Sequence, residues 1–201
     1  MKKLIIIILC ITNLSLFAQE KSFDIGVNAD FGTSFLYHHH HLALPKPNIT
    51  FSPLVGFSFV YNSAKNFSIM TDLNYENKGW TDKVVFTDNT GQEIGQETRR
   101  ISFHSISLSL MPGFITNGKT KFFLNAGPSF NYLIQTQKSN NTPFGYYTLG
   151  LDLKLGIQKQ FTDKLKINIF LQNRLDIYQR VALSMNSVLI GAGVYYKLNK
   201  K

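Results

Sequence analysis

Apolar and polar positions alternate along eight segments that cover most of the chain after its N-terminus. The segment 149–158 shows the alternation best, with Leu149, Leu151, Leu153, Leu155 and Ile157 on one face and Gly150, Asp152, Lys154, Gly156 and Gln158 on the other. Successive side chains of a β-strand point to opposite sides, so such a segment has an apolar face and a polar face. Strands with lipid outside and a polar interior, as in an outer-membrane β-barrel, have this pattern.

The eight segments have the length and spacing of membrane strands. They are Phe23–Tyr37, Phe51–Asn62, Phe67–Lys78, Ile101–Thr116, Lys121–Gln135, Tyr147–Lys159, Lys164–Tyr178 and Ser187–Leu198. Short connections at 63–66, 117–120 and 160–163 alternate with longer ones at 38–50, 79–100, 136–146 and 179–186, which is the pattern of short periplasmic turns and long outer loops. We therefore predict an all-β fold, an eight-stranded antiparallel up-and-down transmembrane β-barrel with both termini on the periplasmic side.

Two features disturb the regular pattern. The apolar phase of the fourth segment changes between Phe103 and Ile106, which predicts either a β-bulge near His104 or a strand that projects beyond the membrane. Prolines lie inside three predicted strands, where a missing N–H predicts bulges or broken pairing. These prolines are Pro53, Pro112 and Pro128.

The N-terminus has the organisation of a secretory signal peptide. Lys2 and Lys3 precede an apolar run, and the segment 15–18 ends on a small residue before Gln19. We expect residues 1–18 to be the signal peptide, cleaved near Ala18 and Gln19, and residues 19–201 to be the barrel domain. The single cysteine, Cys10, lies in the signal, so the mature chain has no thiolate for catalysis, disulfides or metal binding.

The charge of the chain is positive but dispersed. The net charge is +9, and without Lys2 and Lys3 it is +7. After Lys3, basic residues adjoin only at Arg99–Arg100 and Lys200–Lys201, which argues against a nucleic-acid-binding stripe. A basic surface suits contact with outer-membrane lipid headgroups and lipopolysaccharide.

Three segments resemble the PorT-like outer-membrane β-barrel family. They are Phe67–Gly79, with its acidic-leucine pair, tyrosine and closing lysine-glycine, the apolar-proline segment Ser107–Pro112, and the glycine-proline segment Asn125–Leu133. The resemblance covers nearly the whole mature chain. It implies a small eight-stranded outer-membrane barrel that the barrel assembly machinery inserts. It implies no single activity, although the member that gives the family its name is associated with protein secretion.

The polar faces carry charges of both signs that must lie inside the barrel. The candidate interior network comprises Asp72, Glu76, Asp152, Lys154, Lys166, Arg174 and Asp176. Eight strands enclose a space just wide enough for side chains to fill, and buried charges have to be paired. We predict a plugging network with Arg174 as its hub, because a guanidinium bridges several carboxylates. The alternative is a narrow path for ions or small solutes.

Two histidine motifs are candidate sites. The run His38, His39, His40 and His41 at the end of the first strand or in the first outer loop is a candidate metal site, since neighbouring imidazoles bind zinc, copper or nickel. A solvated polar loop is the alternative, and we expect no cofactor. His104 with Ser102, Ser105 or Ser107 is the one arrangement that suits a lipid-modifying enzyme.

The sequence favours a non-enzymatic, monomeric barrel that acts as an envelope scaffold or as a binding or adhesion module. Its long outer loops are the expected contact surface for an envelope protein partner. The loop 79–100 is the longest and carries Trp80, Asp82, Lys83, Phe86 and Arg99. The alternatives are a narrow pore, an outer-membrane enzyme centred on His104, and a soluble ligand-binding barrel of the lipocalin kind with its apolar face inward.

Overall fold

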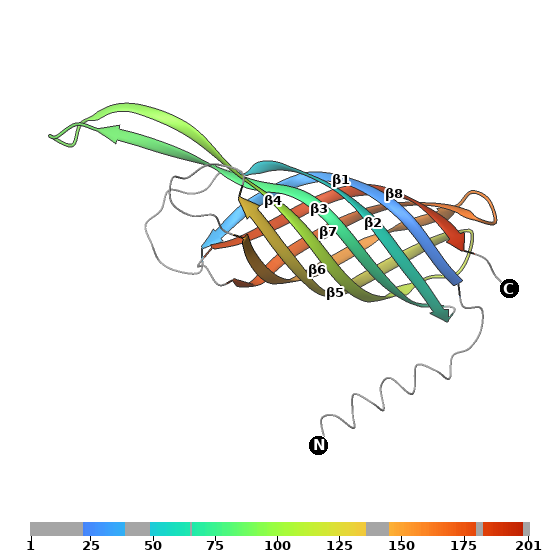
Figure 1. The fold of residues 1–201 in the computed structure, drawn as a ribbon. Coiled ribbons are helices and arrows are strands. Elements are labelled where there is room, and N and C mark those ends of the chain that lie inside the picture. The colour runs from blue at the N-terminus through green and yellow to red at the C-terminus, as the bar shows by residue number, and fades with distance from the viewer. Residues whose placement is uncertain (1–21, 39–48, 65, 136–144, 180–182, 199–201) are drawn as a thin grey trace, which may run out of the picture.

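The computed structural model describes residues 22–38, 49–64, 66–135, 145–179 and 183–198. Eight strands form a closed barrel in which each strand pairs antiparallel with the next and β8 pairs with β1 (Figure 1). The strands are β1 Ser22–His38, β2 Thr50–Ala64, β3 Phe67–Thr87, β4 Glu93–Ile115, β5 Thr120–Gln135, β6 Gly145–Gln160, β7 Leu165–Gln179 and β8 Leu183–Leu198. The predicted eight-stranded antiparallel fold is confirmed. Among the described residues, no helix is long and apolar enough to cross a membrane.

The alternation of the sequence becomes the two faces of the barrel wall. On β6, Leu153 is 42% exposed whereas its neighbours Asp152 and Lys154 are fully buried, and on β7 Ile169 is 60% exposed. The apolar side chains therefore point outward on these strands and the polar ones inward. The lipocalin-like alternative, which required an inward apolar face, is wrong.

The connections between strands are short at one end of the barrel and longer at the other. β1 begins and β8 ends at the same end of the barrel, where Phe23 pairs with Leu198 (Figure 1). The short turns lie at this end too, and one of them contains Gly118 with a positive φ of 119°. This conformation favours glycine and agrees with the turn expected at Asn117–Gly118.

At the opposite end, β3 and β4 continue far beyond the barrel as a two-stranded hairpin (Figure 1). The loop predicted at 79–100 is therefore wrong, because β3 reaches Thr87 and β4 starts at Glu93. The ladder runs without a register shift from Phe67↔Phe114 to Phe86↔Gly95. Of the two explanations for the change of apolar phase in the fourth segment, the β-bulge near His104 is absent from this ladder. The second explanation agrees with the structure, because β4 projects beyond the barrel wall on the hairpin side of this position (Figure 1).

The prolines interrupt pairing without shifting the register. The β4–β5 partners stop after Ser109↔Ser129 and resume at Gly113↔Asn125, on either side of Pro112 and Pro128. This is the broken pairing expected where proline removes an N–H donor. Pro53 has a partner on β1, and the β2–β3 ladder begins one residue after it.

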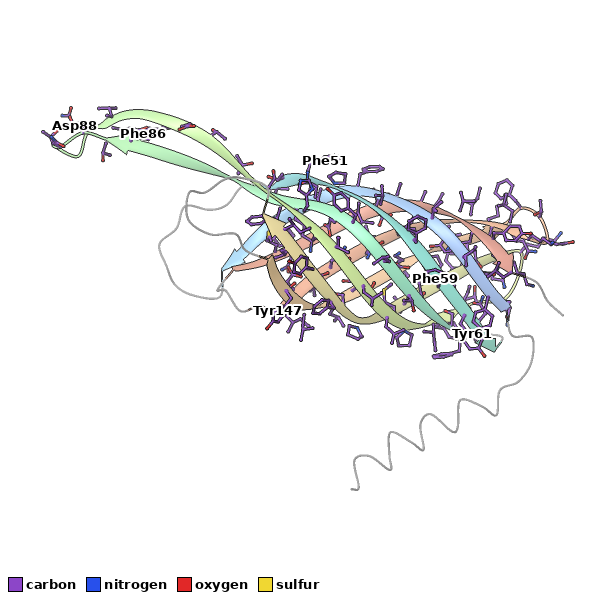
Figure 2. All side chains as sticks on the ribbon, in the orientation of Figure 1. Phe51, Phe59, Tyr61, Phe86, Asp88 and Tyr147 are labelled. Atoms are coloured by element: carbon purple, nitrogen blue, oxygen red, sulfur yellow. The ribbon has the colours of Figure 1, made fainter. Side chains whose placement is uncertain are left out.

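Aromatic side chains stand on the outside near both ends of the wall. Figure 2 shows Tyr61 at the short-turn end and Tyr147 at the hairpin end. At the short turns, Lys159 lies 5.8 Å from the ring of Phe161, and Lys164 lies 5.8 Å from the ring of Tyr196. Aromatic and amphipathic side chains at the two ends of a barrel wall are typical of the two interfaces of a membrane.

Candidate functional site

The barrel interior contains all seven charged residues of the candidate network. Each of them is at most 6% exposed, and they come from β3, β6 and β7. The strand alternation positions them, because they occupy the inward phase of each strand. At this burial a charge needs a partner, and the structure supplies one for each side chain of the network.

Arg174 on β7 bridges two carboxylates and an amide. Its Nη1 lies 2.8 Å from Glu76 Oε2, its Nε lies 3.3 Å from Asp152 Oδ2, and its Nη2 donates to Asn131 Oδ1 at 3.0 Å. Three strands are thereby joined to β7 through one guanidinium. The geometry gives Arg174 the hub position, with a planar fork that satisfies several acceptors.

The carboxylate of Glu76 collects further donors around this hub. The hydroxyls of Ser52 and Ser187 donate to Glu76 Oε1 at 2.9 and 2.6 Å, and Lys78 Nζ lies 3.6 Å from Glu76 Oε2. Lys78 also lies 3.9 Å from Asp176 Oδ1. Glu76 therefore links β2, β3, β7 and β8 at one level of the barrel.

Two further ion pairs lie closer to the short-turn end. Lys154 Nζ is 2.5 Å from Asp72 Oδ2 and 4.3 Å from the centre of the Phe170 ring. Lys166 pairs with Asp24, to which Asn62 also donates at 3.1 Å. The Lys166–Asp24 pair joins β7 to β1 past β8, the strand that lies between them.

Apolar side chains also enter the interior, which the sequence analysis did not predict. One cluster comprises Val60, Met70, Met111 and Tyr195, and a second comprises Ile115, Phe123 and Phe170. The sequence contains an indication of these inward apolar side chains, because Met70 occupies the inward, polar phase of its strand between Ser68 and Asp72. Ion pairs and apolar clusters together occupy the interior, an arrangement suited to a structural plug and poorly suited to a pore.

The projecting hairpin is the second candidate site. Val85, Phe86 and Ile94 near its end are 47%, 40% and 68% exposed, and Figure 2 shows Phe86 and Asp88 far from the barrel. At the tip, the Asp88 carboxylate accepts hydrogen bonds from Thr90 N at 2.8 Å, Thr90 Oγ1 at 2.6 Å and Gln92 N at 2.9 Å. These bonds, with that from Thr90 the strongest cause, lower the pKa of Asp88 below 3.8. Asp88–Gly91 is thus the turn that connects β3 to β4.

His104 lies on the outer face of β4 and not in the interior. Ser105 and Ser107 are buried on the opposite face of the strand, so the structure separates His104 from both of them. Nδ1 of His104 is hydrogen-bonded to the hydroxyl of Tyr75, and the two rings stack with centroids 5.5 Å apart. Of the serines considered, only Ser102 shares the outward phase of His104.

The histidine run cannot be placed as a site. His39, His40 and His41 lie outside the described residues, and so does the side chain of His38. Among the residues that the structure does describe, no group of three or more His, Cys, Asp or Glu side chains is arranged to hold a metal ion. Metal binding by the run stays a prediction.

Comparison with known proteins identifies the family. The model of the outer membrane protein beta-barrel domain family matches residues 17–200. The chain belongs to this family. No curated protein sequence matches it.

Solved structures support the same fold for this outer-membrane β-barrel. Neisserial surface protein A shares 15% identity with a TM-score of 0.56, over 90% of this chain and 100% of that one. OprG of Pseudomonas aeruginosa shares 12% identity with a TM-score of 0.57, over 91% and 98%. Ail, the attachment invasion locus protein of Yersinia pestis, solved in complex with the heparin analogue sucrose octasulfate, shares 11% identity with a TM-score of 0.51, over 88% and 99%. The protein is therefore a small β-barrel of the outer membrane.

Proposed function

We propose that this outer-membrane barrel is a non-enzymatic binding module that holds the β3–β4 hairpin outside the cell to bind a protein partner. The observation that carries the proposal is the exposure of Val85, Phe86 and Ile94 on a ribbon beyond the barrel. Exposed apolar side chains gathered on a projecting element are typical of a protein-interaction surface. The barrel beneath it supplies a rigid support, which is the usual arrangement for loops that bind.

The backbone of the hairpin offers a second means of binding. The β2–β3 ladder ends at Leu54↔Glu76 and the β4–β5 ladder begins at Phe103↔Gln135. Within the described part of the chain, the hairpin beyond Gly79 therefore has no third strand on either side. Such edges bind extended segments of other proteins by adding a strand.

The charge of the outer part of the hairpin, residues 85–98, favours a basic partner. Between Val85 and Thr98 the chain carries Asp88, Glu93 and Glu97 and no lysine or arginine. Complementary charge on two proteins raises their rate of association, and repulsion between like charges disfavours the binding of other proteins. We therefore propose a protein with a basic surface, and not a sulfated polysaccharide of the kind whose analogue is bound in the Ail structure.

The resemblance to PorT-like barrels makes protein secretion the finer hypothesis. On this hypothesis the partner of the hairpin is a component or a cargo of a secretion system in the same membrane. The scaffold role of the barrel is the same in both cases. Identification of the partner decides between a secretion role and adhesion to an external surface.

Site-specific photocrosslinking in living cells tests the proposal. A benzoyl-phenylalanine at Phe86 replaces one aromatic side chain by a larger one on the hairpin, and the same substitution at Phe59, which is 57% exposed on the barrel wall, is the matched control. We expect a discrete protein adduct from position 86 that disappears with Ile94→Asp, and none from position 59. Absence of an adduct at 86 in a correctly folded protein, or the same adduct from both positions, contradicts the proposal.

A further inference from the structure

One amide interrupts the lipid-facing side of β7. Asn173 lies between Gln172 and Arg174, which are both buried inside the barrel, so its own side chain points outward. The outward positions on either side of it are apolar and exposed, and they continue to Ile169 in one direction and to Ile177 in the other. Each of these isoleucines is roughly 13 Å away along the strand. Asn173 is therefore an amide within the apolar band that faces lipid.

The strands beside β7 offer this amide no polar partner. Asn173 pairs with Leu153 on β6 and with Val188 on β8, and both of these side chains are exposed and apolar. The side chain of Asn173 is half-buried, and its Oδ1 has no hydrogen-bond partner among the described residues. An unpaired amide in hydrocarbon is strongly unfavourable, because neither lipid tails nor apolar side chains form hydrogen bonds.

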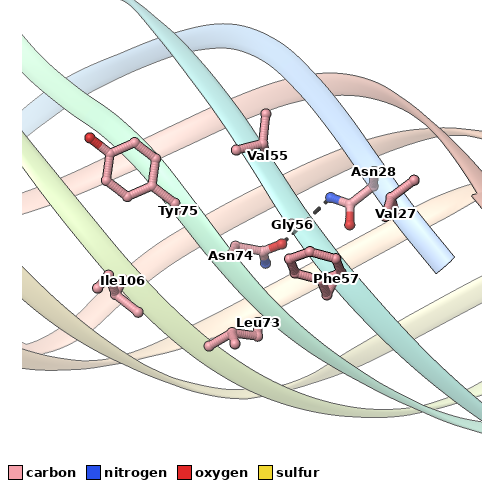
Figure 3. A pocket seen from close by; sticks show the side chains of 9 residues that line it. All are labelled: Val27, Asn28, Val55, Gly56, Phe57, Leu73, Asn74, Tyr75 and Ile106. Carbon is pink, nitrogen blue, oxygen red and sulfur yellow. Dashed lines mark hydrogen bonds between the residues drawn. The ribbon is translucent and has the colours of Figure 1, made fainter. Parts of the chain in front are cut away.

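Amides at other places in the wall have different surroundings. On the inner side, Asn28 donates to Asn74 Oδ1 at 3.5 Å, beneath an outer surface of apolar side chains (Figure 3). On the outside of β8, Asn186 Oδ1 accepts a hydrogen bond from a backbone N–H of β7 at 3.1 Å. Asn77 Oδ1 on β3 also has no partner, but Asn77 lies where the hairpin leaves the wall, within reach of water and headgroups. Asn173 has neither a partner in the chain nor access to water, so its partner has to come from another molecule in the membrane.

We propose that Asn173 joins two copies of this chain within the membrane, with Nδ2 of each copy donating a hydrogen bond to Oδ1 of the other. A carboxamide carries a donor and an acceptor on one group, so two of them related by a two-fold axis satisfy each other. Rotation about the last torsion of the side chain, which is broad for asparagine, brings either atom to the surface. Copies inserted in the same direction are related by an axis along the membrane normal, which places the two asparagines at the same depth.

The side chains around Asn173 supply the rest of this interface. Leu153, Leu171, Leu175 and Val188 surround the amide on three strands and are all exposed. Van der Waals packing and hydrogen bonds between polar side chains are the forces that associate protein segments within a membrane. The dimer replaces the monomer that the sequence favours. It is independent of protein binding by the hairpin, because β3 lies opposite β7 in the strand order and stays outside the interface.

Sedimentation equilibrium of the refolded mature protein in neutrally buoyant detergent micelles tests the proposal. We expect the wild type to show a monomer–dimer equilibrium, and Asn173→Val to weaken the dimer by about tenfold or more. Asn173→Gln should retain the dimer, because glutamine keeps the amide. Thr71→Val is the matched control, since it removes an outward hydroxyl from β3 on the other side of the barrel and should leave the equilibrium unchanged.

Heat-modifiable gel mobility shows that each variant is folded. Asn173→Val takes a polar group off the lipid-facing wall, so we expect it to fold at least as well as the wild type, and loss of its dimer does not then reflect unfolding. A wild type that stays monomeric at every concentration overturns the proposal. An unchanged equilibrium in Asn173→Val, or equal weakening by Thr71→Val, overturns it as well.

Discussion

Nη1 of Arg174 lies 2.8 Å from Oε2 of Glu76 across the inside of the barrel, although 98 residues separate the two in the sequence. Both side chains are buried. Removal of one member of a buried ion pair leaves the other charge without compensation, which costs about 3–5 kcal/mol. The interior network therefore contributes to stability in a way that single substitutions can test.

Arg174→Ala is expected to lower the free energy of unfolding by about 3–5 kcal/mol, because it leaves Asp152 buried without its cation and removes the nearer of the two cations beside Glu76. Urea unfolding in lipid vesicles, followed by gel mobility, measures the change. Lys164→Ala at an exposed turn is the control, with almost no change. A double variant with Arg174→Met and Glu76→Gln should recover part of the loss, and no recovery would show that Glu76 is not the stranded charge.

Gly127→Ala is expected to destabilise the barrel by about 1–3 kcal/mol through overpacking. A Cβ at Gly127 would lie 2.0 Å from the carbonyl oxygen of Leu110, in the stretch where the two prolines interrupt the β4–β5 pairing. Gly95→Ala on the hairpin is the matched control, because no atom lies within 4 Å of a Cβ there. The same urea titration compares the two variants, and equal stability of both would contradict the tight approach of β4 and β5.

The folded protein is expected to show no steady ion conductance in planar bilayers. The ion pairs of Arg174 and the apolar cluster around Met111 occupy the interior at different levels, so Arg174→Ala should stay closed as well. Single-channel recording of protein with verified heat-modifiable mobility is the measurement. Reproducible channels that Arg174→Ala alters would make transport the leading function.

The tip of the hairpin is expected to lose order in acid. The pKa of Asp88 is lowered in the folded tip, so its contribution is fully present above the unfolded value of 3.8 and is lost as the pH falls through the lower folded value. Amide hydrogen exchange at Thr90 and Gln92 should therefore show protection near neutral pH that persists to about pH 3.8 and declines below it. Asp88→Ala should remove the protection at every pH, and unchanged exchange in that variant would exclude the carboxylate as the cause.

Ile169→Arg is expected to destabilise the barrel in lipid by about 2–4 kcal/mol, because Ile169 is 60% exposed on the wall between the two ends of β7. Phe161→Arg at a short turn should cost at most about 1 kcal/mol, since the cost falls near the interface. Unfolding titrations in vesicles measure both. Similar costs at the two positions would contradict the assigned depth of the wall.

The fold could be predicted because strand alternation is a local property of the sequence. The phase of Asp152 and Lys154 alone predicts an inward position for both side chains, and the structure buries both. The hairpin could not be predicted in the same way. Outside the membrane neither face of β3 or β4 has to be apolar, so residues 79–100 lose the alternation that marks a strand.

The contents of the interior were only partly predictable. Charges in the inward phase are conspicuous, whereas Met70 and Phe170 in the same phase resemble isolated exceptions to the pattern. Met70 packs in one cluster with Met111, and Phe170 packs in another with Phe123. These partners come from other strands and reach them only in the closed barrel. The stagger of the strands around the barrel likewise decides which carboxylate lies beside each cation. The sequence of a single strand does not determine this stagger.

The pairing of Lys166 with Asp24 has a consequence for assembly. The two residues are 142 positions apart and belong to β7 and β1, which lie on either side of β8 once the barrel is closed. Before that step each side chain carries its charge alone, and a sheet closed two residues out of register would bury them apart. The Lys166–Asp24 ion pair therefore stabilises the closed barrel in its native register and does not stabilise a shifted one.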